Sequence, residues 1–179
     1  MALARKKSTR SSVRKDVMNA LLNENNPQIL LKLYNKAKKQ TRYDTLIKQL
    51  HRKFLESSMP ALTTGDLGDI DLRKCWIESS VRLKQNMKTR MRTALLNKGY
   101  LQSMLDQLSV AKIGKKNFIK LAKCGAINLT AEYIIFNFYQ HLLSGQQRIA
   151  IANVLQTYNA KLPKHLFLIH ATNGNYSKL

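Results

Sequence analysis

Acidic residues are scarce in this sequence, and their scarcity restricts the partners that the protein can have. The chain of 179 residues contains 10 Asp and Glu residues against 31 Lys and Arg residues, so its formal net charge is +21 at pH 7. A charge so far from zero repels itself within the folded chain, and a bound polyanion relieves that repulsion. The partner is therefore expected to be RNA, DNA, anionic lipid or, less often, an acidic protein.

Cysteine is nearly absent as well. Cys75 and Cys124 are the two cysteines of the chain, and both fall in segments with helical periodicity. Two cysteines so far apart in the sequence provide neither a disulfide framework nor the ligand spacing of a metal site. We expect both thiols to be buried in a reducing compartment, which favours a cytoplasmic or nuclear location.

Long apolar runs are missing too. No segment approaches the length of about 18 apolar residues that a membrane-spanning helix needs, and the first residues lack the apolar stretch of a secretory signal. A helix lying on a membrane surface would need an exposed apolar face, and here the apolar faces are required for a core. We therefore expect no membrane partner.

Catalytic signatures are not found either. The four histidines do not have HExxH spacing, and no GxxxxGK[ST], GxGxxG or GxSxG segment occurs. Asp66, Asp69 and Asp71 form the one acidic cluster and could hold Mg²⁺ for phosphodiester hydrolysis. The simpler explanation is that Asp69 and Asp71 cap and favour the start of a helix. We expect no enzyme, no cofactor, no metal site and no small-molecule substrate.

The sequence is rich in helical periodicity. Apolar residues make up 44 % of the chain and recur three or four positions apart, between capping residues such as Ser12, Asn26-Pro27 and Thr41. No hairpin signal was found. This pattern predicts an all-α fold of seven or eight helices.

The domain organisation follows from the segments that lack this periodicity. A flexible basic arm is expected over 1–11, one helical domain over 12–171 and a polar tail over 172–179. A loop with Pro and Gly at 57–68 is a candidate hinge that would divide the domain into 12–56 and 69–171.

Two helices are expected to organise the domain. A helix over 69–98, ended by Gly99, would be about 45 Å long at 1.5 Å per residue. That length favours a central position or a homo-oligomer. Residues 131–143 are apolar nearly all round, so this second helix should lie at the centre of the core.

Basic residues accumulate where acids are missing, between Glu78 and Asp106 and again between Asp106 and Glu132. Several stand four residues apart, and like charges at that spacing oppose helix formation by a few tenths of a kcal/mol per pair, roughly. A track of phosphates would offset this repulsion. The predicted nucleic-acid-binding residues are Arg5, Lys6, Lys7 and Arg10 in the arm; Lys36, Lys38, Lys39 and Arg42; Arg82, Lys84, Lys88, Arg90 and Arg92; and Lys112, Lys115, Lys116, Lys120 and Lys123.

These clusters predict a non-enzymatic protein that binds nucleic acid largely independently of sequence, with RNA favoured over DNA. A viral or mobile-element RNA-binding or packaging protein fits the size and charge. The alternatives are a DNA-binding transcription or replication accessory protein and a helical adaptor for an acidic protein partner.

Two more specific modes of recognition have weaker signals. A helix-turn-helix over 117–141 would need polar side chains on its second helix, which is mostly apolar. Tyr100 and Tyr176 are the aromatic residues expected to be freest to stack on bases.

Overall fold

The protein is helical throughout the part that the structure describes. The structure, a computed structural model, describes residues 10–60 and 67–160, with the backbone alone at 67–70. Within these ranges the chain forms eight α-helices and three short 3₁₀ helices, and no strand occurs there. The predicted all-α fold is confirmed. Arg5, Lys6 and Lys7 of the predicted arm and the predicted polar tail lie outside the described residues.

The chain divides into two compact units, Met1–Asn97 (unit 1) and Lys98–Leu179 (unit 2). The boundary falls inside a helix, next to Gly99. The helices on either side of the loop at 57–68 both belong to unit 1. The hinge suggested for that loop stays a prediction, because residues 61–66 are outside the described part of the chain.

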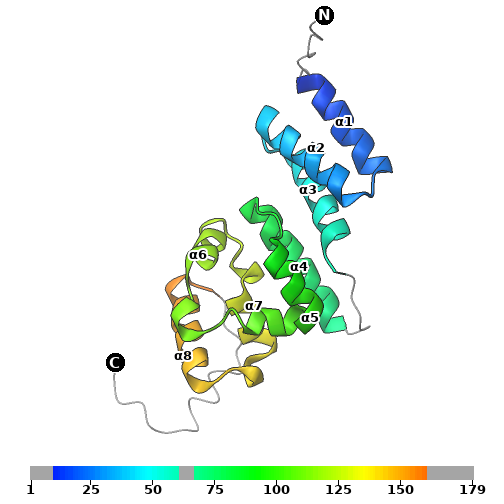
Figure 1. Cartoon of the computed structure of the whole chain (residues 1–179). Coiled ribbons are helices and arrows are strands. Elements are labelled where there is room, and N and C mark those ends of the chain that lie inside the picture. The colour runs from blue at the N-terminus through cyan, green and yellow to red at the C-terminus, as the bar shows by residue number, and fades with distance from the viewer. Residues whose placement is uncertain (1–9, 61–66, 161–179) are drawn as a thin grey trace, which may run out of the picture. The chain divides into compact units, whose positions relative to one another are not determined.

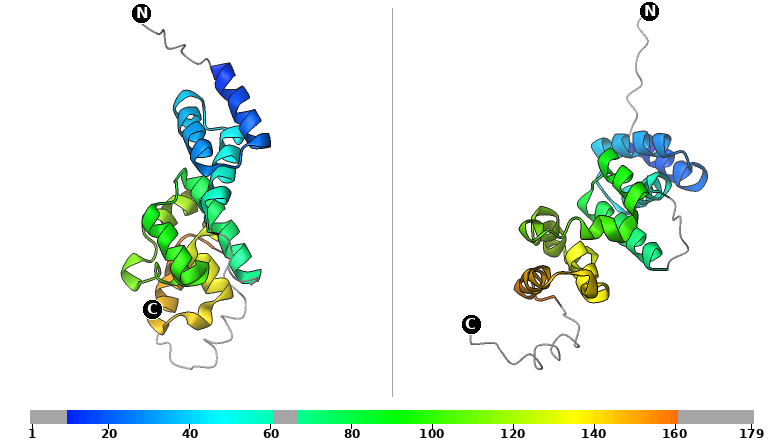
Figure 2. Two further views of the ribbon diagram at one scale, coloured as in Figure 1. Left: turned by 45° about the vertical axis from the view of Figure 1, so that its right-hand side comes forward. Right: turned by 60° about the horizontal axis from the view of Figure 1, so that its bottom comes forward.

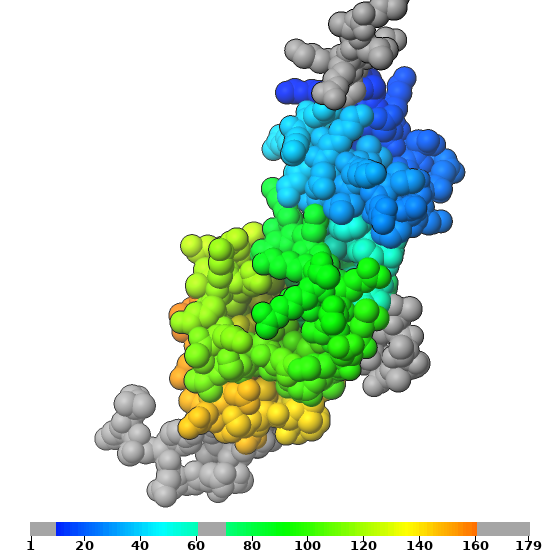
Figure 3. All heavy atoms as spheres, in the orientation of Figure 1, coloured from blue at the N-terminus to red at the C-terminus, as the bar shows by residue number. Residues whose placement is uncertain are grey.

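Unit 1 is built mainly from α1 (Arg10–Asn23), α2 (Pro27–Gln40), α3 (Thr45–Ser58) and α4 (Leu67–Leu83). The first three helices pack against one another, and α3 also packs against α4, as Figures 1 and 2 show. In the space-filling view, the side chains of α1 and α2 form one continuous surface, in blue (Figure 3). The start of α1 at Arg10 removes this residue from the predicted arm and places Ser12 inside the helix.

Polar caps set the starts of α2 and α3. The Asn26 side chain accepts a hydrogen bond from the backbone of α2, and Pro27 occupies the first helical position, as predicted. The Asp44 side chain accepts a hydrogen bond from the Ile47 N–H and caps α3. Thr41, expected to open that helix, instead ends α2. Helix α3 therefore begins three residues later than the sequence suggested, after Asp44 and not after Thr41.

The core of unit 1 contains a histidine among apolar side chains. Leu30, Leu50 and Tyr34 are fully buried, and so is His51 of α3. The rings of Tyr34 and His51 are stacked with their centroids 4.2 Å apart. Such a buried ring pair links α2 to α3 and leaves little room for a second arrangement of the two helices.

The single helix predicted over 69–98 is wrong. Helix α4 ends at Leu83, and α5 (Thr89–Leu105) begins after a turn and is itself broken at Gly99. Lys84 has φ 54, its N–H donates to the Val81 carbonyl, and the Gln85 N–H donates to the Ser80 carbonyl. These two bonds and the left-handed residue form a Schellman motif, which ends a helix.

The sequence concealed this helix end because the motif usually carries glycine at the position that Lys84 occupies. A lysine in the left-handed region costs about 1–2 kcal/mol, so Lys84 is not expected to end a helix. The apolar spacing of Leu83, Met87 and Met91 continues across this position and therefore favours one uninterrupted helix. With the long helix gone, the argument that it forms a homo-oligomer loses its basis.

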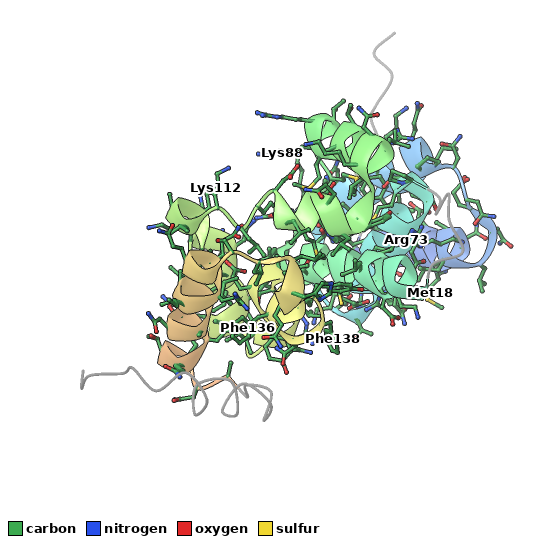
Figure 4. All side chains as sticks on the ribbon, turned by 90° about the horizontal axis from the view of Figure 1, so that it is seen from below. Met18, Arg73, Lys88, Lys112, Phe136 and Phe138 are labelled. Carbon is green, nitrogen blue, oxygen red and sulfur yellow. The ribbon has the colours of Figure 1, made fainter. Side chains whose placement is uncertain are left out.

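Unit 2 contains the end of α5 and three further α-helices, α6 (Lys116–Lys123), α7 (Ala131–Phe138) and α8 (Gly145–Thr157). Helix α7 packs against α8, and α8 packs against the 3₁₀ helix Val110–Lys112. The core contains Ile135, Phe136, Ile151 and Leu155, which have at most 1 % of their surface exposed. Phe136 lies between the ribbons of unit 2 in Figure 4.

The prediction for residues 131–143 is confirmed in part. Ile134, Ile135 and Phe136 are buried in the core, as expected. The helix ends at Phe138, however, and a separate 3₁₀ helix spans Gln140–Leu142. Phe138 is 71 % exposed, so α7 buries one side and does not stand at the centre of the core with all of its faces covered.

None of the helices in the described part of the chain combines the length and the hydropathy that a membrane span requires.

Candidate nucleic-acid interface

The C-terminal ends of α2 and α4 lie side by side in unit 1. Lys38 Nζ, in the last turn of α2, donates a hydrogen bond of 3.2 Å to the backbone carbonyl of Lys84. The Tyr43 hydroxyl donates to the carbonyl of Val81, in the last turn of α4, also at 3.2 Å. The basic cluster at 36–42 therefore lies next to the beginning of the basic cluster at 82–92, although the two are far apart in the sequence.

Two lysines of this surface have internal partners. Lys38 Nζ lies 5.4 Å from the centroid of the Tyr34 ring, and Lys84 Nζ lies 4.7 Å from the centroid of the Tyr43 ring. A cation over an aromatic face at an exposed site contributes about 0.5–1 kcal/mol. Lys38 joins α2 to the residue after α4 through its hydrogen bond to the Lys84 carbonyl, and Lys84 contacts the connection between α2 and α3, whatever the protein binds.

A neutral histidine lies beneath these cations. The Tyr43 hydroxyl oxygen is 3.1 Å from His51 Nδ1. Since the hydroxyl proton is donated to Val81, this contact requires the proton on Nδ1. Burial lowers the pKa of His51 to about 4, and the charge of Lys38 acts in the same direction. His51 is therefore uncharged at neutral pH and adds nothing to the basic surface.

The remaining cations at this end have no carboxylate partner. The ion pairs within residues 10–60 and 67–160 are Arg14–Asp44, Lys36–Asp16, Arg52–Glu78, Lys74–Asp71 and Lys98–Asp106. Of the predicted binding residues, Lys36 alone takes part in one of them. Besides Arg10, Lys38 and Lys84, six others are exposed in unit 1 without such a pair: Lys39, Arg42, Arg82, Lys88, Arg90 and Arg92.

Three of these cations surround the N-terminus of α5. The Lys88 carbonyl accepts hydrogen bonds from the Met91 and Arg92 N–H groups, so Lys88 immediately precedes the helix that carries Arg90 and Arg92. The first turn of α5 contains no acid. The partial positive charge of a helix N-terminus disfavours each nearby cation by roughly 0.3–1 kcal/mol. This placement has no structural benefit, unlike that of Lys38 and Lys39 in the last turn of α2.

The predicted row of Lys84, Lys88 and Arg92 along one helix is wrong. Lys84 ends α4, Lys88 precedes α5 and Arg92 lies inside α5. The three side chains therefore do not follow one helical face, although the latter two remain together at the start of α5.

Unit 2 repeats the arrangement at the start of α6. Lys115 is the residue before the helix and Lys116 its first residue, again with no acid in the first turn. Lys120 and Lys123 share with Lys116 the face opposite the buried Phe118, as predicted. Lys112, which ends the preceding 3₁₀ helix, is also exposed and lies at the periphery of unit 2 in Figure 4. These five lysines form no ion pair in the described part of the chain.

The segment 112–116 is anchored from two sides. Gly114 has φ 69, and its N–H donates a 3.1 Å hydrogen bond to Glu132 Oε1 of α7. A Cβ on Gly114 would lie 2.9 Å from Val154 Cγ2 of α8. Burial raises the pKa of Glu132. The sequence gives no sign of the interactions of Gly114 with α7 and α8, because these partners are distant in the chain.

Most of the acidic cluster at Asp66, Asp69 and Asp71 lies outside the described residues. Asp66 and the side chain of Asp69 lie outside them, and the exposed Asp71 pairs with Lys74 at 3.3 Å. No group of three His, Cys, Asp or Glu side chains that could hold a metal ion occurs among the residues that the structure describes.

Several expectations about single residues need correction. Cys75 is half-buried, but Cys124 is exposed, because it caps the end of α6. Tyr100, expected to be free for base stacking, is 2 % exposed, and Tyr176 lies outside the described residues. A 3₁₀ helix (Ile127–Leu129) stands where a helix-turn-helix would turn, and the following α7 buries Ile134, Ile135 and Phe136.

Comparison with protein families, with characterised protein sequences and with solved structures found no match to this chain.

Proposed function

We propose that this protein binds the phosphate backbone of nucleic acid, RNA in preference to DNA, largely independently of sequence and without catalysing a reaction. One observation carries the proposal. Exposed cations stand at the N-termini of α5 and α6, where the helix dipole opposes them and no acid occurs in the first turn. We expect an anionic ligand to compensate for the unfavourable interaction between these cations and the helix dipole at both helices.

Phosphate is the anion that suits both places. Backbone N–H groups and the dipole at a helix N-terminus favour a phosphate group, and Lys and Arg side chains add charge-assisted hydrogen bonds. Each phosphate that a cation neutralises also releases a counterion from the nucleic acid. Contacts of this kind position a strand without reading its bases, which is the reason for proposing little sequence preference.

The proposal assigns different roles to the predicted residues. The residues proposed to contact phosphate are Lys39, Arg42, Arg82, Lys88, Arg90 and Arg92 of unit 1 and Lys112, Lys115, Lys116, Lys120 and Lys123 of unit 2. Lys38 and Lys84, although exposed, are assigned a structural role, because they contact Tyr34 and Tyr43 and because Lys38 donates to the Lys84 carbonyl. A role in RNA packaging for a virus or mobile element, in the cytoplasm or nucleus, is the setting we propose.

The test is the affinity for single- and double-stranded RNA and DNA at two salt concentrations, measured by fluorescence anisotropy. We expect binding to all four, tightest for RNA, with the logarithm of the affinity falling linearly with the logarithm of the salt concentration. A matched pair of variants locates the interface. Arg90→Ala with Arg92→Ala should weaken binding, while Lys32→Ala with Lys74→Ala removes the same charge elsewhere and should weaken it less.

Three results would overturn the proposal. A chain that ignores every oligonucleotide at low salt does not bind nucleic acid. A large preference for one duplex sequence over bulk competitor would favour the DNA-binding regulator. Affinity for polyglutamate equal to that for RNA would favour the adaptor for an acidic protein.

A further inference from the structure

Unit 2 contains one buried carboxylate in a strongly basic environment. Its described residues, 98–160, have two acids, Asp106 and Glu132, against seven basic residues: Lys98, Lys112, Lys115, Lys116, Lys120, Lys123 and Arg148. Asp106 is exposed and accepts hydrogen bonds from Lys98 at 2.7 Å and from Gln102 at 2.9 Å. Glu132 is 8 % exposed and takes part in no ion pair within residues 98–160.

Capping of α7 does not explain why Glu132 is buried. The Thr130 side chain already caps α7 by accepting a hydrogen bond from the Tyr133 N–H at 3.1 Å. A glutamate in the first turn would interact with the helix dipole equally well from an exposed position. Burying a carboxylate is costly unless hydrogen bonds compensate for the lost water. The partner outside its own helix that compensates Glu132 is the Gly114 N–H.

That hydrogen bond reaches the segment that carries exposed lysines. Ile113 is buried, and Val154 leaves no room for a Cβ at Gly114, because such an atom would lie 2.9 Å from Val154 Cγ2. Lys112 and Lys115, on either side, are both exposed. The backbone of the segment is thus fixed between α7 and α8 while its cationic side chains extend into solvent.

We infer that Glu132 is a positioning residue of the nucleic-acid interface, whose buried carboxylate holds Gly114 and thereby fixes Lys112, Lys115 and Lys116 for phosphate binding. This inference rests on the proposed function. Fixing the backbone before binding reduces the loss of conformational freedom when the strand is bound. The carboxylate strengthens anion binding through the hydrogen bond although its charge alone would weaken it.

Three substitutions separate the charge of Glu132 from its hydrogen bond. Glu132→Gln removes the charge and keeps an acceptor oxygen, Glu132→Asp keeps the charge on a side chain too short to reach Gly114, and Glu132→Leu removes both. Asp106→Asn is the matched control, because it removes one exposed negative charge from the same unit. The probe is a short fluorescein-labelled oligouridylate, and the measurements are its affinity and the dependence of that affinity on salt.

The expected affinities follow the hydrogen bond to Gly114 and do not follow the net charge. Glu132→Gln and Asp106→Asn should bind the probe as tightly as the wild type or slightly more tightly. Glu132→Asp should bind about threefold to tenfold more weakly at unchanged net charge, through lost preorganisation. Glu132→Leu should also bind more weakly than the wild type although it has lost an acid. Hydrogen exchange at the Gly114 N–H should be faster in the Asp and Leu variants than in the wild type and the Gln variant.

Circular dichroism measures whether each variant is folded. If the Glu132→Leu variant is unfolded, the affinity of the Glu132→Asp variant tests the inference. Affinity of the Asp variant equal to that of the wild type would overturn the inference while leaving the proposed function intact. So would an unchanged affinity in a Lys115→Ala, Lys116→Ala variant, since the positioned lysines would then not contact the strand. If the wild type itself binds no oligonucleotide, the proposed function fails and this inference fails with it.

Discussion

Lys38 donates a hydrogen bond to the backbone carbonyl of Lys84, 46 residues further along the chain. The two lysines are thus neighbours although both are positively charged, because the ammonium group of Lys38 contacts the backbone of Lys84 and not its side chain. The carbonyl belongs to Lys84, the residue directly after α4. A lysine ammonium near this helix end compensates the negative end of the helix dipole. The same atom of Lys38 also lies over the Tyr34 ring. We therefore consider Lys38 a structural residue of unit 1.

Lys38→Met tests this role, because methionine keeps the length of the side chain and removes its charge. Unit 1 should lose about 1 kcal/mol of its free energy of unfolding, from the hydrogen bond and the contact with Tyr34. Urea unfolding followed by the fluorescence of Trp76, the single tryptophan and a core residue of unit 1, measures the loss. Lys32→Met, an exposed position on the same helix, should change stability by less than about 0.5 kcal/mol. Equal midpoints for the two variants would contradict the assignment.

What the sequence predicted correctly depends on local interactions. Asn26 caps α2 through the N–H two residues ahead, and Lys116, Lys120 and Lys123 share a helix face because of the helical repeat. Such features involve neighbours in the chain, so residue type and spacing are sufficient to find them.

What the sequence could not predict depends on partners that are distant in the chain or on unusual backbone geometry. Lys84 ends a helix in a conformation that glycine usually adopts. The contact of Lys38 with Lys84 and that of Gly114 with Glu132 join different helices. The density of basic residues therefore indicated the candidate interface. The structure was needed to separate the lysines that have partners within the protein from the cations that have none among the described residues.

Lys84 provides a second prediction, because two replacements should have opposite effects. Lys84→Ala keeps the strain of the left-handed backbone and loses the contact with Tyr43, so unit 1 should become less stable. Lys84→Gly also loses that contact but relieves strain of about 1–2 kcal/mol, so unit 1 should be at least as stable as the wild type. Thermal unfolding followed at Trp76 compares them. An alanine variant as stable as the glycine variant would mean that the backbone at this position is not left-handed in solution.

The buried His51 makes the stability of unit 1 depend on pH. Its pKa is about 4 in the folded state against an ordinary value of 6.5, so the folded state binds fewer protons than the unfolded state between these values. The contribution of the neutral ring is fully present above pH 6.5 and is lost as the pH falls towards 4. The full loss is about 3 kcal/mol, at 1.36 kcal/mol per pKa unit.

Urea unfolding at a series of pH values measures this loss. His141→Gln should leave the pH dependence of unfolding unchanged, because His141 is exposed and lies in unit 2. His51→Gln should be less stable at neutral pH and should show a flatter decline between pH 6.5 and 4. A decline in the His51→Gln variant as steep as that of the wild type would assign the pH dependence to carboxylates instead.

The start of α5 provides the most direct test of the proposed function, because binding and stability should change in opposite directions there. Arg90 and Arg92 are exposed in the first turns of this helix, near its positive end. Replacing both with alanine removes an unfavourable interaction with the dipole, so unit 1 should gain a few tenths to about 1 kcal/mol of stability. The same change should reduce the slope of log affinity against log salt by about two units, one per lost phosphate contact.

The double variant Lys38→Ala, Lys39→Ala is the matched control, since it removes the same charge from the last turn of α2, where the dipole favours cations. It should lower the stability of unit 1 and reduce the salt slope by about one unit, because Lys38 serves the fold and Lys39 alone is free to contact phosphate. Under the proposed function, the arginines at this helix start lower the stability of unit 1 and raise its affinity for phosphate. If Arg90→Ala, Arg92→Ala left both the salt slope and the midpoint of unfolding unchanged, these arginines would be ordinary solvated residues and the interface would have to lie elsewhere.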